Sequence, residues 1–532
     1  MAQTEPTKTA TREGSRTPRR SGGARNRRAA RTTYPGDKAV RPGLAGGGYR
    51  PLSSRDMERI HQTALKVLEN IGMADPIPIL RERALEKGCW IGDQGRLHFP
   101  AALVEDVVAG VDRNACFQGR DDRYDVDLSG SSVHYAPGAE AINTIDFESG
   151  RYRPSTLVDL YDFARLIDSF EHVDVFSRVA VATELEDAFD IDFNIAYASL
   201  AGTNKHVELG FAKGENLERT LPLIHMIAGG EKKYLERPFC SAFGCPVVSP
   251  LTYGEDNATT CVAGIKLNSP VNLIIGPQAG STAPAALAGT LVQVVAEALA
   301  ATLLVNLVKP GHPVVFGLWA SIADLRTAAF SGGGGEQALI SAASSQLGNF
   351  YDLPTTVSAG ITDSKAVDAQ MGFEKAISTV LATLAGTNGV GHSCGMMASL
   401  LACSFESMVI DNEMLGMIQR TVRGIDVTDE SLSYEVIEDV VLNGPNHFLA
   451  HPQTLELMET EYLYPDLADR APPDVWEEGG ALDIKDRART RVRQTLSTHY
   501  PEYIDPKLDR EIRERFPILL AEEDMRPECG RW

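Results

Sequence analysis

The stretch Leu353–Lys365, LPTTVSAGITDSK, decides the fold of this chain. Its β-branched residues at 355–357 predict a short buried strand, and Gly360 marks the end of that strand. The residues from Ala366 to Ala385 then have the pattern of a helix. A strand that runs through a polar loop into a helix is one unit of a parallel α/β fold. In such a fold the catalytic groups emerge at the C-terminal ends of the strands.

The same order of strand and helix recurs from residue 157 to residue 424. Strands are expected at 173–182, 206–211, 239–248, 271–276, 313–320, 355–360 and 389–393, with helices at 157–169, 188–200, 217–228, 258–267, 283–308, 336–350, 366–385 and 405–424. So regular an alternation predicts an α/β protein with a (β/α)8 TIM barrel rather than an open sheet. Two further strands, Val133–Tyr135 and Ala141–Asp146, are expected to pair as a hairpin.

Composition divides the chain into four predicted parts. Residues 1–50 hold 12 Lys and Arg against 3 Asp and Glu, show no apolar periodicity, and are predicted to be a disordered basic tail. Residues 51–130 are predicted to form an N-terminal helical segment, and 131–430 the barrel catalytic domain. Residues 431–532 are predicted to be a C-terminal helical extension.

The net charge of -21 restricts the expected partners. Because the tail is basic, the rest of the chain is strongly acidic and is expected to bind neither nucleic acid nor an anionic membrane. The apolar stretch Ala283–Val308 contains Gln293, Glu297 and Asn306, which favours a buried helix over a membrane span. The 8 cysteines form no CxxC pair, so reduced thiols are expected rather than disulfides. These features favour a soluble cytoplasmic enzyme.

The residues just after each predicted strand are expected to line the mouth of the barrel. They are His134, Tyr135, Glu208, Phe243, Cys245, Gln278, Trp319, Ile361–Lys365 and His392–Cys394. The run Ser331–Gly335 lacks the Lys-Ser/Thr of a phosphate loop, so a nucleotide site is not expected. Aromatic faces with a few acids suit a small cationic ligand, which each face attracts by about 0.5–2 kcal/mol. The alternative is that these aromatic residues only fill the core.

Several motifs, in order along the chain, resemble those of the trimethylamine methyltransferase family. They are Gly119–Asp121, Asp363, Lys365, Asp368, Gln370, Gly372, Glu374, Lys375, Phe405-Glu406 and Val409–Glu413, together with the first helix. The resemblance runs from residue 54 to residue 520 and implies a (β/α)8 barrel. It also implies transfer of a methyl group from a methylated amine to the cobalt of a separate corrinoid protein.

One position departs from the family pattern. Family members that act on trimethylamine carry pyrrolysine where this chain has Ile361, and an alkyl side chain cannot form an adduct with an amine nitrogen. The chain therefore resembles the non-pyrrolysine branch, which acts on quaternary amines such as glycine betaine. A quaternary nitrogen is already cationic and leaves as a neutral amine, so methyl transfer requires mainly positioning in a dry pocket.

The resemblance and the residue types together suggest roles. The catalytic candidates are Ile361, Asp363 and Glu336, the last two also as possible counter-charges for an ammonium ion. The candidates for substrate binding are Tyr135, Phe243 and Trp319 around the ammonium, Glu208 as its counter-charge, and Lys365 and His392 for a substrate carboxylate. Lys365 is equally consistent with a structural salt bridge to Asp363 or Asp368.

The methyl acceptor is expected to come from outside the chain. No D-x-H-x-x-G pattern for cobalamin binding occurs, so a corrinoid protein in transient contact, or free cobalamin, would supply the cobalt. The chain is not expected to hold the corrinoid stably, and no metal site of its own is predicted. The family resemblance also implies a homo-oligomer.

Three other functions remain open at this point. The first is trimethylamine:corrinoid methyl transfer, as the family name implies. The second is a zinc-dependent thiol methyltransferase, because His392-x-Cys394 resembles part of a zinc site, with a third ligand from Cys240, Cys245 or Cys403. The third is a barrel that binds a betaine without catalysis.

Overall fold

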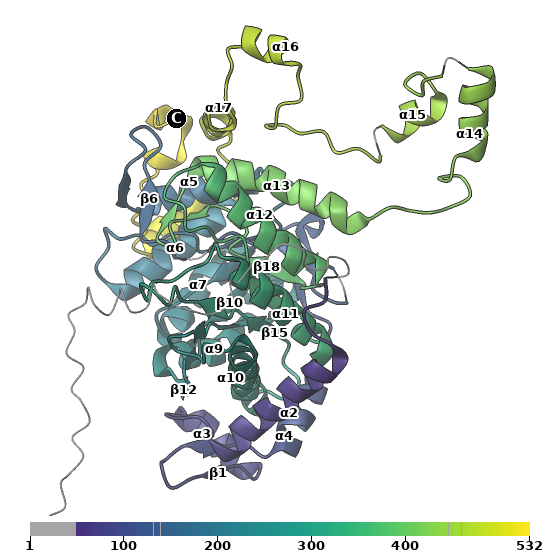
Figure 1. The fold of residues 1–532 in the computed structure, drawn as a ribbon. Helices are drawn as coiled ribbons and strands as arrows, with labels where there is room; N and C mark the ends of the chain where they lie inside the picture. Colours follow the sequence, from purple (N-terminus) through teal and green to yellow (C-terminus); the bar gives the residue numbers. More distant parts are fainter. Residues whose placement is uncertain (1–48, 131, 139, 445, 459) are drawn as a thin grey trace, which may run out of the picture. The chain divides into compact units, whose positions relative to one another are not determined.

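Eight parallel strands form the centre of the fold (Figure 1). The computed structural model describes residues 49–532 except 131, 139, 445 and 459, so nearly all of the predicted basic tail, 1–50, lies outside the described residues. The strands of the central sheet are β5 (His134–Tyr135), β8 (Val175–Ser177), β9 (His206–Leu209), β10 (Cys240–Gly244), β13 (Val271–Ile275), β15 (Val314–Leu318), β17 (Thr355–Ser358) and β18 (Gly389–Gly391).

The central sheet closes on itself. Its strands are hydrogen-bonded in the order β5-β18-β17-β15-β13-β10-β9-β8, and every pairing is parallel. At the two ends of this order, the Asp174 N–H donates to the carbonyl oxygen of Tyr135 at 2.9 Å, and Ala141 forms a parallel bridge with Ala180. Neighbours in the ring are therefore neighbours in sequence, and the predicted (β/α)8 barrel is confirmed.

A helix follows each barrel strand. These helices are α5 (Leu157–Asp168), α6 (Ala188–Gly202), α7 (Gly214–Ala228), α9 (Glu255–Gly264), α10 (Leu287–Val308), α11 (Gly335–Tyr351), α12 (Ala369–Leu384) and α13 (Phe405–Arg423). Several begin where the sequence places a cap. Thr156 and Asp159 form a capping box at the start of α5, and the Asp187 carboxylate accepts two backbone N–H groups at the start of α6.

The helix α10 is long and apolar enough to cross a membrane, but most of it is buried inside the protein. The helix packs against β13 and β15 on one side and against α2 (Ser54–Asn70) and α4 (Ala101–Gly110) on the other. Its buried carboxyl group, Glu297, accepts hydrogen bonds from Ser249, the Leu251 N–H and Gln293. These contacts are those of a buried core helix, as predicted.

The predicted hairpin of Val133–Tyr135 with Ala141–Asp146 is wrong. β5 instead pairs in parallel with β18, and the Ala136 N–H donates to the Val390 carbonyl. β6 (Asn143–Ile145) belongs to a separate sheet, where it pairs with β7 (Tyr152–Pro154) and β20 (Ala402–Cys403). The physical reason is that the barrel needs an eighth strand between β18 and β8, and β5 supplies it.

The N-terminal segment packs its helices against α10 and its last hairpin against one end of the barrel. It contains α2, α3 (Pro78–Glu86) and α4, the small ladder of β1 (Trp90–Ile91) with β2 (Leu97–His98), and the hairpin of β3 (Cys116–Phe117) with β4 (Val126–Asp127). Phe117 and Leu128 from this hairpin region pack against Val175 and Val315, which face the barrel interior. The hairpin therefore closes the N-terminal end of the barrel.

The C-terminal extension contains α14 (Tyr434–Glu438), α15 (Pro452–Leu457), α16 (Pro473–Glu478), α17 (Ile484–Thr498) and α18 (Pro506–Arg515). α17 packs against α13 and α5, and the buried Arg165 of α5 donates to the carbonyl of His499 at 2.6 Å. Residues 324–329 form a turn in which Arg326 pairs with Asp324. The boundaries of the four predicted parts remain predictions.

Candidate active site

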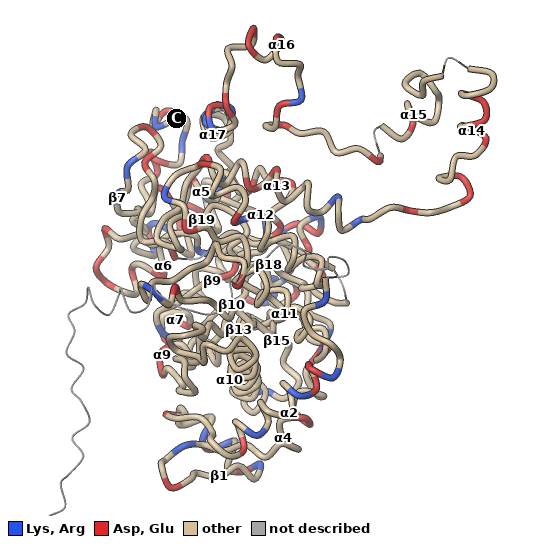
Figure 2. Tube along the Cα trace, in the orientation of Figure 1, with Lys and Arg blue, Asp and Glu red and all other residues tan. Residues whose placement is uncertain are grey.

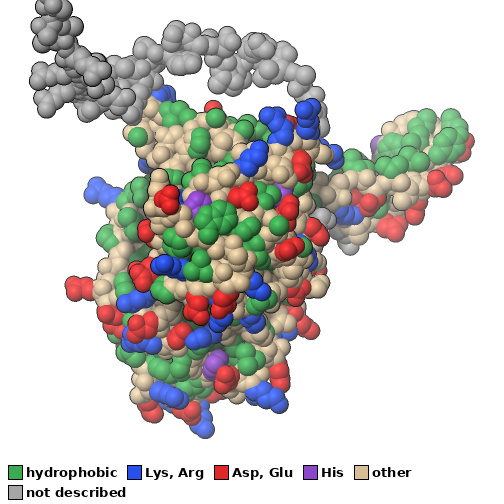
Figure 3. Space-filling model, turned by 90° about the horizontal axis from the view of Figure 1, so that it is seen from below, with side chains coloured by type: hydrophobic (Ala, Val, Ile, Leu, Met, Phe, Trp, Pro, Cys, Tyr) green, Lys and Arg blue, Asp and Glu red, His purple; other side chains and the backbone are tan. Residues whose placement is uncertain are grey.

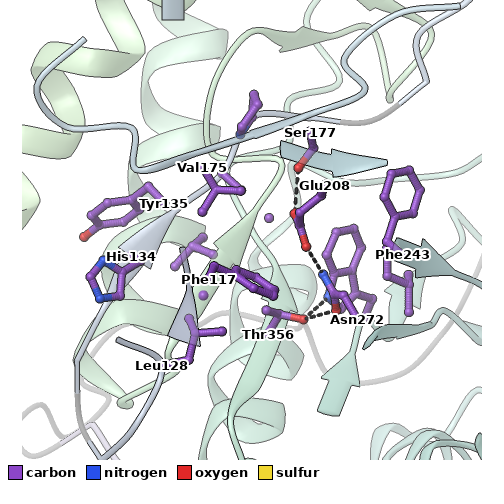
Figure 4. Close-up of a pocket in the computed structure, with 17 residues that line it drawn as sticks. Phe117, Leu128, His134, Tyr135, Val175, Ser177, Glu208, Phe243, Asn272 and Thr356 are labelled. Carbon is purple, nitrogen blue, oxygen red and sulfur yellow. Dashed lines mark hydrogen bonds between the residues drawn. The ribbon is translucent and has the colours of Figure 1, made fainter. Parts of the chain in front are cut away.

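A cavity lies inside the barrel between the β3–β4 hairpin and the C-terminal ends of the strands (Figure 4). The space between its walls, including the part that is open to solvent, is about 520 Å³. Its lining side chains are Phe117, Leu128, His134, Tyr135, Val175, Ser177, Glu208, Phe243, Asn272, Ile274, Trp319 and Thr356. Four of the predicted substrate-binding residues, Tyr135, Glu208, Phe243 and Trp319, are thus brought to one cavity.

A chain of hydrogen bonds crosses the barrel and ends on Glu208 (Figure 4). The Trp319 indole N–H donates to the Thr356 hydroxyl at 3.0 Å, and that hydroxyl donates to the Asn272 side-chain oxygen at 3.4 Å. The Asn272 amide then donates to one carboxylate oxygen of Glu208 at 2.7 Å, and the Ser177 hydroxyl donates to the other at 2.7 Å. All donors point toward Glu208, so the network holds its carboxylate in a fixed position.

Glu208 has no cationic partner in the described part of the chain. Its residue is only 5% exposed, and burial raises the pKa of its carboxyl group while the bonds from Ser177 and Asn272 oppose that rise. No Lys or Arg is among the residues that line the cavity. An ionised carboxylate buried without a counter-charge is destabilised by several kcal/mol. A cationic ligand in the cavity would supply the missing charge.

The aromatic side chains around this carboxylate come from three parts of the chain. Phe243 is the penultimate residue of β10, Trp319 directly follows β15, and Phe117 comes from the hairpin that closes the barrel. Tyr135 also lines the cavity, but its hydroxyl lies 3.4 Å from the Thr383 hydroxyl of α12, and Figure 4 shows its ring turned away from Glu208. Phe117, Phe243 and Trp319 therefore supply the apolar faces nearest to the hydrogen-bonded network.

His392 supports Trp319 rather than lining the cavity. It follows β18 in a left-handed backbone conformation with φ 62°, which is strained for a residue with a side chain. Its ring meets the Trp319 ring edge-on at 4.7 Å between centroids, and its Nδ1 lies 2.8 Å from the Ser358 hydroxyl. Burial lowers the pKa of His392 to about 3. The imidazole is therefore neutral near pH 7 and offers a hydrogen bond but no charge.

Asp363 connects loops at the mouth of the barrel through hydrogen bonds to its carboxylate. Its carboxylate accepts hydrogen bonds from the Gly332 and Gly333 N–H groups at 2.9 and 3.1 Å and from the hydroxyls of Ser331 and Ser399 at 3.2 and 2.7 Å. Three of these four donors belong to the loop 331–335, so the Asp363 carboxylate holds this loop in place. This loop is the glycine-rich run that lacks the features of a phosphate site.

Ile361 lies directly beneath that loop and is only 1% exposed. A Cβ atom at Gly332 would come within 2.2 Å of the Ile361 side chain, and one at Gly333 within 2.3 Å of Glu374. Glu374 in turn accepts from the Thr362 hydroxyl at 2.6 Å and the Asp363 N–H at 2.8 Å. The glycines are thus required by close packing, and Ile361 forms part of the floor under the loop.

Two other predicted site residues lie outside the cavity. Lys365 is exposed, and its ammonium group donates to the Asp363 carbonyl at 2.5 Å. Glu336 is exposed on the first turn of α11. Neither is among the residues that line the cavity inside the barrel.

The residues of the alternative zinc site have other contacts. The Cys394 thiol lies 3.5 Å from the Met408 carbonyl, and the Cys403 thiol lies 3.3 Å from the Val179 carbonyl. Among residues 49–532, apart from the four positions not described, no group of three or more His, Cys, Asp or Glu side chains is arranged to hold a metal ion.

The sequence did not single out Ser177, Asn272 and Thr356, which position Glu208. Asn272 and Thr356 lie inside barrel strands and Ser177 is the last residue of one, so none of them follows a strand. Alternate side chains of such strands face the interior. A polar residue at an interior position of an otherwise apolar strand, as in Val271–Ile275, is the signal that could have identified them. Phe117 had no such signal, because its hairpin lies outside the repeating units.

Comparison with known proteins finds a family that covers most of the chain. A family model described as trimethylamine methyltransferase (MTTB) matches residues 19–517. Trimethylamine methyltransferase MttB of Desulfitobacterium hafniense is 30% identical over 478 residues, which cover 89% of this chain and 95% of the relative. Glycine betaine methyltransferase of the same species, from strain Y51, is 29% identical over 467 residues, which cover 87% of this chain and 96% of the relative.

A solved structure is also similar. The monomethylamine methyltransferase MtmB of Methanosarcina barkeri has 13% sequence identity and a TM-score of 0.44, with 83% of this chain and 93% of that chain covered. The family model, in contrast, spans nearly the whole sequence apart from the first 18 residues and the last 15. The chain belongs to the trimethylamine methyltransferase family.

Proposed function

We propose that this protein moves a methyl group from a quaternary amine, of the glycine betaine type, to the Co(I) centre of a corrinoid. The observation that carries the proposal is Glu208, a buried carboxylate that is oriented by two hydrogen bonds and has no cationic partner among the residues that the structure describes. Phe243, Trp319 and Phe117 share its cavity. A negative charge among aromatic faces is the recognition pattern for a trimethylammonium group, which cannot donate a hydrogen bond.

The chemistry of a quaternary amine fits a site with few proton donors. When the methyl group leaves, the electron pair of the methyl–nitrogen bond stays on nitrogen, and the product is a neutral tertiary amine. No proton has to be delivered to the leaving group. The protein's task is to hold one methyl group toward the mouth and to exclude water. The fixed carboxylate and the neutral His392 are consistent with this positioning role.

Ile361 supports the choice of a quaternary amine over trimethylamine. It is packed beneath Gly332 and carries no group that could bind an amine nitrogen covalently. The glycine betaine methyltransferase named above supports the same substrate type for this chain. Trimethylamine is protonated near pH 7 and would have to lose that proton in a cavity that contains a carboxylate, which favours the protonated form.

The methyl acceptor has to approach from outside. A complete corrinoid, with its peripheral amide side chains, is larger than this cavity, and the lining is mainly aromatic and aliphatic, so the residues inside the barrel do not fit it. We infer that a cytoplasmic corrinoid protein presents the cofactor transiently at the mouth, near the loop 331–335 that Asp363 organises. The corrinoid then supplies the nucleophile, and this chain supplies the oriented methyl donor.

Ligand binding tests the recognition step separately from catalysis. Isothermal titration of the purified protein should detect glycine betaine or choline and should find much weaker binding of 3,3-dimethylbutanol, the uncharged carbon isostere of choline. The expected preference is about 2–3 kcal/mol, or about 30–150-fold, because the isostere lacks the charge that Glu208 attracts. Equal affinity for the charged and uncharged compounds would contradict the proposal.

A further inference from the structure

The outer face of α12 is apolar and carries no charge. Phe373 is 63% exposed, and Ile377 and Leu384 are also exposed, so the three side chains form one stripe along the helix. The two charged residues of α12, Glu374 and Lys375, are both buried. Surface helices normally present charged side chains to water, and a bare apolar stripe marks a contact surface.

A second apolar surface lies on residues 425–464, which we call the arm. The arm includes α14, the helical turn Asp439–Asn443 and α15 (Figure 1). Among the described residues of the arm, which leave out 445 and 459, fourteen large apolar side chains are exposed, including Leu449 at 79%. Hydrogen bonds between the side chains of Ser433 and Gln453 join its two helical parts. The apolar side chains of the arm therefore stand on helical turns that contact each other.

Both ends of the arm are anchored on α13. Arg420 and Arg423 at the end of α13 form ion pairs with Glu461. Glu413 accepts hydrogen bonds from the backbone N–H groups of Asp466 and Ala468, both at 2.7 Å. The arm is thus a fixed loop rather than a free tail, and the direction in which it leaves the barrel is set by α13.

That direction is away from the mouth. α13 begins after β18, at the mouth, and a barrel helix runs back toward the N-terminal ends of the strands. Its later turns contact His172, which precedes β8: the Gln419 side chain lies 2.9 Å from the His172 ring, and Asn412 accepts the His172 N–H at 3.0 Å. The corrinoid must reach the mouth, so a corrinoid protein is not the partner that the arm covers.

The charge of the arm restricts its partner further. Residues 425–464 contain nine Asp and Glu and no Lys or Arg. Figure 2 traces the acidic residues along this segment, and in Figure 3 the same segment, at the right, shows hydrophobic side chains beside acidic ones. Two arms would repel each other. The uncharged stripe of α12, in contrast, offers apolar contact without like charges.

We propose that the arm of one copy of this chain covers the α12 stripe of a second copy. In the single chain both surfaces are exposed, so the arm does not cover α12 of its own chain. The arm has 40 residues, more than the roughly 20–30 that each side of a stable interface contributes. The covered helix also holds Glu374, which fixes the mouth loop through Thr362 and Asp363. The contact therefore stabilises the helix that supports the active-site loop.

Light scattering after size exclusion tests the contact in the full-length protein. The wild type should be a homo-oligomer, and a Phe373→Glu/Ile377→Glu double variant should fall to a smaller species, because it places two charges in the contact. Val248→Glu is the matched control, since Val248 is equally exposed on β11 (Val247–Val248), outside α12 and the arm. A monomeric wild type, or a double variant with unchanged mass and unchanged circular dichroism, would overturn the proposal.

Disulfide trapping identifies which chain the arm contacts. Two differently tagged chains are coexpressed, one with Ile377→Cys and the other with Leu449→Cys, so that a bond between these positions can form only between copies. A covalent heterodimer on a non-reducing gel is expected, and the pair Val248→Cys with Leu449→Cys should give none. If a single chain with both Ile377→Cys and Leu449→Cys cross-links only within itself, the arm folds back on its own α12 and the proposal fails.

Discussion

Glu208→Gln is the substitution that most directly probes the charge in the cavity. Glutamine has the shape of glutamate, and its amide can still accept the hydrogen bond from Asn272 and donate one to the Ser177 hydroxyl. The change therefore removes the negative charge while the network across the barrel remains. Because burial raises the pKa of the Glu208 carboxyl, the ionised form is destabilised in the folded protein. The free energy of unfolding near pH 8 should stay the same or increase.

The expected loss of affinity follows from the charge separation. An ammonium centre in contact with a carboxylate lies about 4–5 Å from it, and at an effective dielectric constant of about 20 the attraction is about 3–4 kcal/mol. The burial cost that the charge imposes on the site offsets part of this attraction. We therefore expect a loss of about 2–3 kcal/mol, or about 30–150-fold in Kd, for a quaternary amine.

Isothermal titration with glycine betaine and choline measures this loss. Glu297→Gln is the matched control, because Glu297 is also a buried carboxyl with a raised pKa and protein hydrogen-bond donors, but it lies on α10 outside the cavity. The control should bind with the affinity of the wild type. If Glu208→Gln binds as tightly as the wild type while remaining folded, Glu208 is not the counter-charge and the reasoning is refuted.

Three further predictions follow from the same contacts. Trp319→Ala removes an aromatic face worth about 0.5–2 kcal/mol and the indole N–H that donates to Thr356. The Kd for a quaternary amine should therefore rise about 3–30-fold, and an unchanged Kd would exclude Trp319 from the site. A bound cation lowers the raised pKa of Glu208, so binding should release a proton. The affinity for the cation should therefore increase with pH until Glu208 is ionised in the free protein, and then stay constant. Titrations at several pH values should show this pH dependence in the wild type, and a pH dependence retained in Glu208→Gln would assign it to another group. Lys375→Met leaves the buried Asp411 without its ion-pair partner at 2.6 Å, so the free energy of unfolding should fall by about 3–5 kcal/mol. Calorimetry should show a lower Tm. An equal loss of stability in the double variant Lys375→Met/Asp411→Asn would argue against the uncompensated charge as the cause.

The barrel could be predicted from sequence because its elements repeat. Segments such as Val271–Ile275 and Thr355–Ser358 are short, β-branched and buried, and helices of ordinary length separate them. The first strand was harder to place. His134–Tyr135 is only two residues long, and its partner β18 lies more than 250 residues away. Local pattern therefore suggested a hairpin with the next extended segment, whereas closure of the barrel determines the actual pairing.

The cavity was predicted only in part, for a related reason. Glu208, Phe243 and Trp319 lie at or near strand ends, where the barrel fold itself places functional groups. Ser177, Asn272 and Thr356 contact Glu208 or one another only because closure of the barrel turns the interior side chains of β8, β9, β13 and β17 toward one another. His392 is a typical candidate for carboxylate binding by residue type, yet burial makes it neutral. Its environment, which sequence does not give, decides its charge.

Methyl transfer to Co(I) cobalamin tests the central claim most directly. The purified protein is incubated anaerobically with reduced cobalamin and, in separate reactions, glycine betaine, choline or trimethylamine, and the absorbance of the cobalamin reports its methylation. We expect methylation with at least one quaternary amine, release of the corresponding tertiary amine, and loss of activity in Glu208→Gln. Methylation by trimethylamine alone, or tight binding of quaternary amines with no transfer from any of them, would contradict the account.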